Sequence, residues 1–412
     1  MTTLASDPST SLRRQRSFVL FWCARVAATS AFQMQAVAIG WQIYDLTGSA
    51  LDLGLVGLVQ FVPVVVLALL VGHVADRYDR RLVVRVAQLV EAAAAVALAI
   101  GSAEGWLSIP VIFAIVFVAG TARAFELPTM HALVPGLIPP SLFSRAVAGS
   151  TSANQAAVVL GPAIGGLLYA VGPTVVYLTC TALFLVASVL VTLIRRIEVP
   201  ARLREPFKLV SLFAGFAFIR ERRELVGVVT LDLFVILLGG AVALLPIYAR
   251  DILRVGPEGL GVLRSASAVG ALASSLLLSR HPLRRHVGSI LFAAVTCFGV
   301  ATAVFAVSTS LTLSLVALAL CGASDAVSVV IRFSLVQIRT PSEMRGRVSS
   351  VNSLFVGASN TLGDFEAGVT AAWFGAVPAV LIGGVGGVLV AVIWMRLFPE
   401  LAKIETLDTT TA

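Results

Sequence analysis

Charged side chains interrupt the long apolar segments of this sequence, where an ionised group needs a partner, water or a chemical role. At the centre of a lipid bilayer, each such charge costs roughly 2.5–3.5 kcal/mol on insertion scales. Carboxylates in so apolar a setting are suited to bind and release protons, and arginines are suited to pair with them. The residues of this kind are Arg25, Glu91, Arg123, Glu126, Asp232, Arg264, Asp325, Arg332, Asp364 and Glu366.

Asp232 is the first candidate for a proton carrier, ahead of Asp325 and Glu126. It lies about eight residues into an apolar segment and has no basic residue within one helical turn. The alternative is a position at a helix end, among lipid headgroups. Arg123 and Glu126 are three residues apart and Asp325 precedes Arg332 by seven, so each pair shares one face of a helix. These pairs indicate either mutual neutralisation or further proton carriers.

Neither the cysteines nor the histidines indicate a metal site or a disulfide framework. Every cysteine falls inside an apolar segment, and the histidines lie scattered at predicted helix ends. The sequence also lacks the G-x-x-x-x-G-K-[ST] phosphate loop and any nucleophile constellation. We therefore predict no cofactor and no metal, and we expect no enzyme.

The elements that position these charges are transmembrane helices. With 58% hydrophobic and 13% charged residues in 412, the chain does not resemble an ordinary soluble domain. Apolar runs of about 20 residues predict an all-α membrane protein of twelve transmembrane helices. The predicted helices are 17–44, 52–74, 82–102, 108–131, 143–170, 174–194, 225–248, 258–279, 287–307, 310–335, 346–370 and 376–398.

The basic residues set the orientation. Most of the 30 lysines and arginines fall in alternate loops, which the positive-inside rule places in the cytoplasm together with both termini. Topology rather than nucleic-acid binding therefore explains the net charge of +8. Arg25 interrupts the first apolar segment, which predicts an uncleaved helix rather than a signal peptide.

The chain divides into two predicted halves. We expect a cytoplasmic tail at 1–16, a six-helix bundle at 17–194, a cytoplasmic linker at 195–224, a second six-helix bundle at 225–398 and a tail at 399–412. The linker contains an amphipathic stretch at 209–219 that would lie on the inner membrane face. A shift of about 202 residues matches Gly120 with Gly322, Arg145 with Arg347 and Gly161 with Gly363. These matches indicate two parallel six-helix repeats.

A charged turn between the second and third apolar segments resembles the loop that marks the major facilitator superfamily of transporters. Its pattern is G-x-x-A-D-R-x-x-R-R at 72–81. The resemblance implies a conformational lock on the cytoplasmic side, in which Asp76 meets the amino terminus of the eleventh helix near Gly346. The lock residues would be Gly72, Asp76, Arg77, Arg80 and Arg81.

Further segments resemble the bacterial enterobactin-exporter family along essentially the whole chain. They are Ala24-Arg25, Gly40-Trp41-Gln42-Ile43-Tyr44, Leu127-Pro128, Ala132-Leu133-Val134-Pro135, Ala214-Gly215-Phe216-Ala217-Phe218 and Gly363-Asp364. Members of that family export siderophores, drugs or metal ions from the bacterial cytoplasm, driven by the proton gradient. The stretch Gly161-Pro162-Ala163-Ile164-Gly165-Gly166 matches the core of the G-P-x-x-G-G signature of exporters, although Ala157 replaces an expected glycine. A tight helix crossing is the alternative explanation of that stretch.

The resemblance also implies that helices 1, 4, 7 and 10 line a central cavity. This placement favours Arg25, Arg123, Glu126, Asp232, Asp325 and Arg332 as cavity charges, with Asp364 on helix 11. Arg123 and Asp325 match under the repeat shift and could form an inner gate. Glu91 falls on the usually peripheral third helix, where we expect a structural hydrogen bond.

The sequence thus predicts a proton-coupled secondary transporter, working by alternating access in the bacterial inner membrane. It would export a small amphipathic organic molecule, either a siderophore or a drug-like compound. Its expected partners are that substrate, protons and the lipid bilayer, with no nucleic acid, and we expect a monomer. A metal-ion exporter of the same fold is the alternative, and an importer is a weaker one. The substrate itself is not encoded in any motif.

Overall fold

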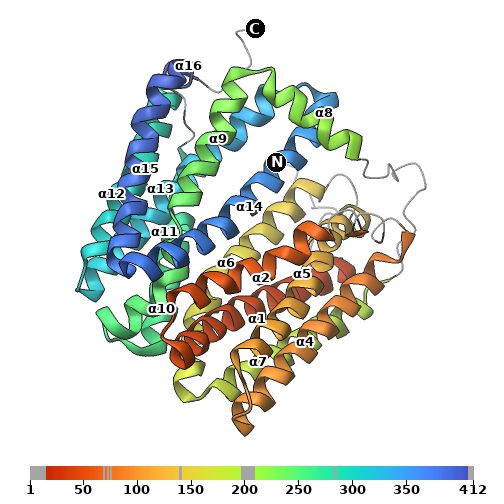
Figure 1. The fold of residues 1–412 in the computed structure, drawn as a ribbon. Helices are drawn as coiled ribbons and strands as arrows, with labels where there is room; N and C mark the ends of the chain where they lie inside the picture. The colour runs from red at the N-terminus through yellow and green to blue at the C-terminus, as the bar shows by residue number, and fades with distance from the viewer. Residues whose placement is uncertain are drawn as a thin grey trace, which may run out of the picture. The chain divides into compact units, whose positions relative to one another are not determined.

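The computed structural model describes residues 15–67, 70, 71, 74, 77–138, 142–195, 209–281, 283 and 285–406 (Figure 1). Two of the predicted lock residues, Gly72 and Asp76, lie outside this range. The described chain is built from helices, and no strand occurs in it. These helices pack into two compact units.

The first unit contains the described residues up to 39 and those from 62 to 195. Its elements are α1 (Arg16–Thr47) and α2 (Ala50–Val66), each in part, with α4 (Arg80–Glu104), α5 (Ile109–Leu137), α6 (Phe143–Val171) and α7 (Pro173–Thr192). In this unit α4 packs against α5 and α7. Asp79 caps the start of α4 by accepting a hydrogen bond from the backbone of Arg81, and Gly105 ends the helix at φ 74°.

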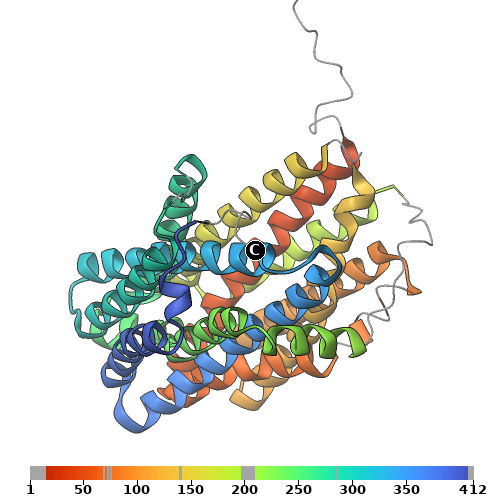
Figure 2. The same ribbon diagram turned by 90° about the horizontal axis from the view of Figure 1, so that it is seen from above.

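The second unit contains residues 40–61 and the described residues from 209 to 406. After α8 (Leu209–Arg220) and α9 (Arg223–Leu238) come η5 (Ala241–Leu244), α10 (Leu245–Ile247), η6 (Tyr248–Ile252), α11 (Gly256–Arg280), α12 (Val287–Val307), α13 (Leu311–Ile338), α14 (Ser342–Phe374), α15 (Ala376–Leu397) and α16 (Pro399–Ala402). The helix α12 packs between α13 and α15, and α13 also packs on α11 (Figure 2).

The prediction of twelve transmembrane helices is confirmed. Nine spans in the described residues are long and apolar enough to cross a membrane, counting Arg223–Ile252 as one. The shorter apolar α2 and the more polar α1 and α14 complete the set. The described helix of the linker, α8, also occurs where it was expected. It packs against α14, and a Cβ at Gly215 would lie 2.7 Å from the carbonyl oxygen of Arg347.

The seventh predicted helix differs from the expectation because it is not continuous. It ends at Leu238, and a 3-10 turn and a π-helical turn follow before Ile252. Two consecutive glycines, Gly239 and Gly240, weaken the helix, and Pro246 cannot donate a backbone hydrogen bond. The break also lets α14 approach closely, since a Cβ at Gly240 would lie 2.3 Å from the carbonyl oxygen of Gly363.

Candidate functional site

A cavity of about 650 Å³ opens within the second unit and is lined mainly by α9, α13 and α14. Its wall combines aromatic and aliphatic side chains with polar and charged ones. The polar and charged members are Asp232, Ser267, Asp325, Arg332, Asn352, Ser353, Asn360 and Asp364. Three glycines, Gly239, Gly240 and Gly322, contribute backbone atoms to the same wall. Four of the predicted transmembrane charges, Asp232, Asp325, Arg332 and Asp364, share this concave site.

Arg332 lies between two carboxylates of this wall. Its Nη1 forms a short ion pair with Oδ1 of Asp232 on α9, and its Nη2 lies 3.6 Å from Oδ1 of Asp325 on its own helix. The arginine side chain is 5% exposed and that of Asp232 12%, whereas that of Asp325 is 46% exposed. The Nε of Arg332 donates to the carbonyl of Ser328 at 3.3 Å.

The surroundings of Asp232 differ from the sequence interpretation in one respect, the presence of a basic partner. Its own helix offers no basic neighbour, but α13 supplies Arg332 from 100 positions further along the chain. Asp232 is buried and lies in the interior of α9 rather than at its end. The structure also forms the predicted pair of Asp325 with Arg332.

One guanidinium shared by two carboxylates leaves one negative charge when both acids are ionised. Buried charges demand compensation, so one proton bound by either acid neutralises the group. Because the acids interact through the same arginine, they titrate as a coupled pair rather than independently. The arrangement can therefore bind one proton and release it to the cavity.

Asp364 lies on α14 at the cavity wall, close to α2. A Cβ at Gly57 would lie 3.3 Å from the Cβ of Asp364, and one at Gly54 would lie 3.0 Å from the Cα of Gly368. Glycines at both positions let the two helices approach at backbone distance. The carboxylate interacts electrostatically with Arg264 on α11, a half-buried partner that the sequence spacing did not reveal.

The first unit holds the other predicted cavity charges. Arg123 forms a short ion pair with Glu126, as expected from their spacing, and its guanidinium lies 4.4 Å from the ring centre of Phe32. Arg25 instead hydrogen-bonds to neutral side chains, donating to Ser150 at 3.1 Å and to Asn154 at 3.4 Å.

Of the predicted lock residues, Arg77 is exposed. Arg80 and Arg81 form hydrogen bonds with backbone carbonyl groups near the ends of neighbouring segments. Arg80 donates to the carbonyl of Ala132 on α5 at 2.8 Å. Arg81 donates to the carbonyl of Ile194 at 2.6 Å and pairs with Asp79 at 2.8 Å. Both arginines thus join the start of α4 to its neighbours in the first unit.

The glycines of the predicted exporter signature lie at a crossing of α6 and α1. A Cβ at Gly161 would lie 2.7 Å from the Cβ of Gln33, and one at Gly165 would lie 2.7 Å from the Cα of Met34. Pro162 lies inside α6 next to this crossing, and Gly166 is also buried. The geometry fits the close helix contact that was the alternative explanation of this stretch.

Sequence reasoning missed a polar cluster where α1 meets η6. The Tyr44 hydroxyl forms a short hydrogen bond with Asp251, and Arg250 donates to the carbonyl of Tyr44 at 3.0 Å. Arg250 also lies 3.3 Å from Asp45. Tyr44 and Arg250 lie about 200 positions apart, and nothing in the sequence indicated that they meet. The π-helical turn η6 carries Arg250 to this position.

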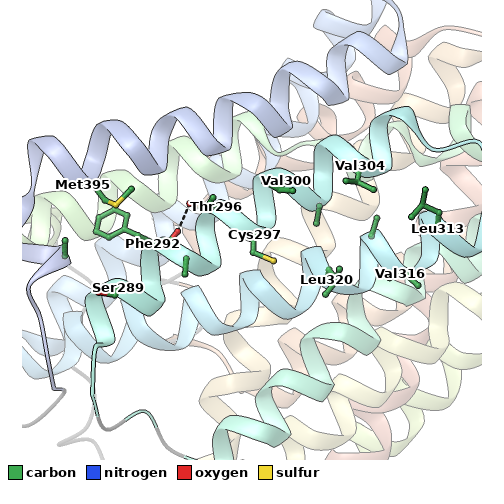
Figure 3. A pocket seen from close by; sticks show the side chains of 14 residues that line it. Ser289, Phe292, Thr296, Cys297, Val300, Val304, Leu313, Val316, Leu320 and Met395 are labelled. Atoms are coloured by element: carbon green, nitrogen blue, oxygen red, sulfur yellow. Dashed lines mark hydrogen bonds between the residues drawn. The ribbon is translucent and has the colours of Figure 1, made fainter.

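A second pocket, between α12 and α13, is apolar (Figure 3). Phe292, Val304 and Leu320 are among its lining residues. The hydroxyl of Thr296 is turned to its own backbone and donates to the carbonyl of Phe292 at 2.8 Å (Figure 3). Such a lining suits lipid chains, so the cavity with Arg332 is the candidate substrate and proton site.

Comparisons with curated proteins give two groups of exporters. The chain is 27% identical to the enterobactin exporter EntS of Salmonella choleraesuis over 393 residues, which cover 92% of this chain and 88% of that protein. It is 26% identical to macrolide efflux protein A of Streptococcus pyogenes over 267 residues, covering 63% of this chain and 65% of that protein. The match to the second protein thus spans less than two thirds of its length.

Solved structures share the fold at low sequence identity. A bacterial homologue of the iron transporter ferroportin, in an inward-facing state, gives a TM-score of 0.72 at 17% identity and covers 94% of this chain and 99% of its own. A bacterial homologue of the human lysosomal transporter Spinster gives 0.74 at 14% identity, covering 95% and 98%. The expected fold is therefore confirmed, and the neighbours are membrane transporters rather than enzymes. Residues 8–412 match the family described as transmembrane secretion effector, and the chain belongs to this family of major facilitator superfamily transporters.

Proposed function

We propose that this multi-pass membrane protein exports a small amphipathic organic molecule in exchange for protons. The observation that carries the proposal is Arg332 held between Asp232 and Asp325 on the wall of the cavity. The transporter would work in the bacterial inner membrane with both termini in the cytoplasm, as the positive-inside pattern predicts.

The proton is coupled to substrate through competition for the carboxylates that share Arg332. With both carboxylates ionised, the group carries a net negative charge beside the cavity and binds either a proton or a hydrogen-bond donor of the substrate. Asp325 is the more accessible acid, since 46% of its side chain is exposed. A proton bound there loosens the longer contact to Arg332 and leaves the buried pair with Asp232 intact.

The cavity wall favours an amphipathic substrate. Phe298, Phe333 and Val329 provide apolar surface, while Asn352 and Asn360 provide hydrogen-bonding groups. Organic molecules with mixed character suit such a lining. The two relatives, a macrolide efflux protein and an enterobactin exporter, are both named for the export of organic molecules, which supports this substrate class.

A metal-ion exporter fits the site less well. The two carboxylates closest together already share the guanidinium of Arg332, whose positive charge opposes a cation between them. In the described residues, no group of three or more histidine, cysteine, aspartate or glutamate side chains is placed to hold a metal ion.

The proposal is tested in cells loaded with the macrolide erythromycin. The expected result is energy-dependent efflux that stops when the pH gradient is collapsed while ATP remains. Asp232→Asn and Asp325→Asn should each reduce uphill efflux at least tenfold, and Glu400→Gln, an exposed acid on α16, serves as the matched control. Efflux that persists without a pH gradient would exclude proton coupling, and accumulation instead of efflux would reverse the direction.

A further inference from the structure

Glu91 is a buried acid that the cavity site does not use. It lies near the middle of the 25-residue α4, and only 2% of its surface is exposed. Both of its carboxylate oxygens are buried and accept no hydrogen bond from any described residue. The structural hydrogen bond expected from the sequence is therefore not formed.

The neighbours of Glu91 explain why it is left without a donor. The helices packed against α4 are α5 and α7, which lie beside it in Figure 1. On α5, Arg123 pairs with Oε2 of Glu126, and Gln88 of α4 donates to Oε1 of Glu126 at 3.0 Å. Both oxygens of Glu126 are thus satisfied. The nearby guanidinium that could compensate Glu91 is already engaged.

The remaining surroundings offer no substitute. Arg25 on α1 interacts with Arg123 and Glu126 and donates its hydrogen bonds to α6. The helix α7 carries no acidic, basic or histidine side chain, and its titratable residues Tyr177 and Cys180 are buried. Cys180 is turned to the carbonyl of Ala31 at 3.3 Å.

An ionised carboxylate in this position is strongly disfavoured, because both oxygens are buried and neither accepts a hydrogen bond from a described residue. The protonated acid avoids the buried charge, and burying it unpaired is far less unfavourable than burying the carboxylate. The geometry points to Glu91 as a second proton-binding site of the transport cycle, protonated in the conformation described. This inference rests on the proposed proton-coupled function.

The same geometry supplies a way to release the proton. When water reaches Glu91, its O–H bond breaks, the proton passes to water and the carboxylate keeps the electron pair. Arg123 is the cation that interacts electrostatically with Glu91, and it must then divide its donors between Glu91 and Glu126. Loss of the proton therefore weakens the pair that joins Arg123 to Glu126 and changes the packing between α4 and α5.

Infrared difference spectroscopy tests the protonation state without any substrate. The full-length protein at pH 7 is compared with Glu91→Gln, which keeps the shape and removes the acid. We expect the difference spectrum to show the carbonyl band of a protonated carboxylic acid in the wild type only. A carboxylate band in its place would overturn the inference. Glu104→Gln, an exposed position on the same helix, should show the carboxylate band and serves as the control.

Transport distinguishes a proton carrier from a permanently protonated structural residue. With erythromycin as the probe, Glu91→Gln should lose at least tenfold in uphill efflux while downhill exchange stays within twofold of the wild type. Glu91→Asp should recover part of the uphill activity. If Glu91→Gln pumps as the wild type does, the inference is wrong. If the wild type itself shows no proton-driven efflux, the proposed function fails instead, whatever the infrared result.

Discussion

Removing the positive charge of Arg332 should destabilise the second unit more than any other single change at the cavity. Arg332→Gln leaves the carboxylate of Asp232, whose side chain is 12% exposed, without a counter-charge. Breaking a buried ion pair from one side typically costs about 3–5 kcal/mol. At about 2–4 °C of melting temperature per kcal/mol for a unit of this size, the midpoint should fall by about 10 °C.

Second substitutions show which carboxylate is responsible. Adding Asp232→Asn to Arg332→Gln should restore most of the lost stability, because the buried uncompensated charge is removed. Adding Asp325→Asn should restore little, since the side chain of Asp325 is 46% exposed and its contact to Nη2 is 3.6 Å long. The measurement is thermal unfolding of the purified variants in one detergent. Equal or better recovery with Asp325→Asn would refute the reasoning.

The same variant has a predictable pH dependence. Without Arg332, Asp232 in the folded protein can escape its uncompensated charge by taking up a proton. The folded state then binds more protons than the unfolded state, so stability falls as pH rises. Arg332→Gln should accordingly lose more melting temperature at pH 8 than at pH 6, relative to the wild type at each pH. If the loss of melting temperature does not depend on pH, Asp232 does not take up a proton in the variant, and the reasoning is wrong.

Three further predictions concern other parts of the molecule. Gly165→Ala should lose about 1–3 kcal/mol through overpacking against Met34, whereas Gly149→Ala on the same helix, with open space at its Cβ position, should be neutral or slightly stabilising in thermal unfolding. Gly288→Val should release the end of the described chain, because a Cβ there would lie 1.9 Å from the carbonyl oxygen of Leu401; faster limited proteolysis after α16 measures this, and an unchanged cleavage rate would contradict it. Asp76→Asn should abolish most transport at normal membrane levels, as the signature loop predicts, and wild-type efflux rates in that variant would dismiss the predicted lock.

The sequence predicts the helices well because each one must be long enough to cross the hydrocarbon core of the bilayer. Hydrophobic length alone locates such helices, and charge pairs within one helix follow from its repeat. The pairs Arg123–Glu126 and Asp325–Arg332 were visible for this reason, and the structure forms both.

Contacts between helices were not visible in the same way. Arg332 reaches Asp232 across 100 positions of chain, and no spacing rule connects two residues on α13 and α9. The close approach of α14 to Gly240 joins residues more than 100 positions apart, and the glycines alone do not reveal it. Glu91 lacks a donor because Gln88 and Arg123 both donate to Glu126 instead. Each of these outcomes follows from packing rather than from local sequence.

Each unit thus contains a cluster in which one arginine interacts with two carboxylates, but the two clusters differ in exposure. In the second unit, the side chain of Asp325 is 46% exposed, so its carboxylate is accessible from the cavity in the conformation described. In the first unit, Glu91 is 2% exposed and Glu126 is 1% exposed. A proton on Glu91 is therefore trapped until α4 and α5 move. If both sites take part in the proposed exchange, Asp325 should respond to pH at once, while release from Glu91 should be limited by the conformational change.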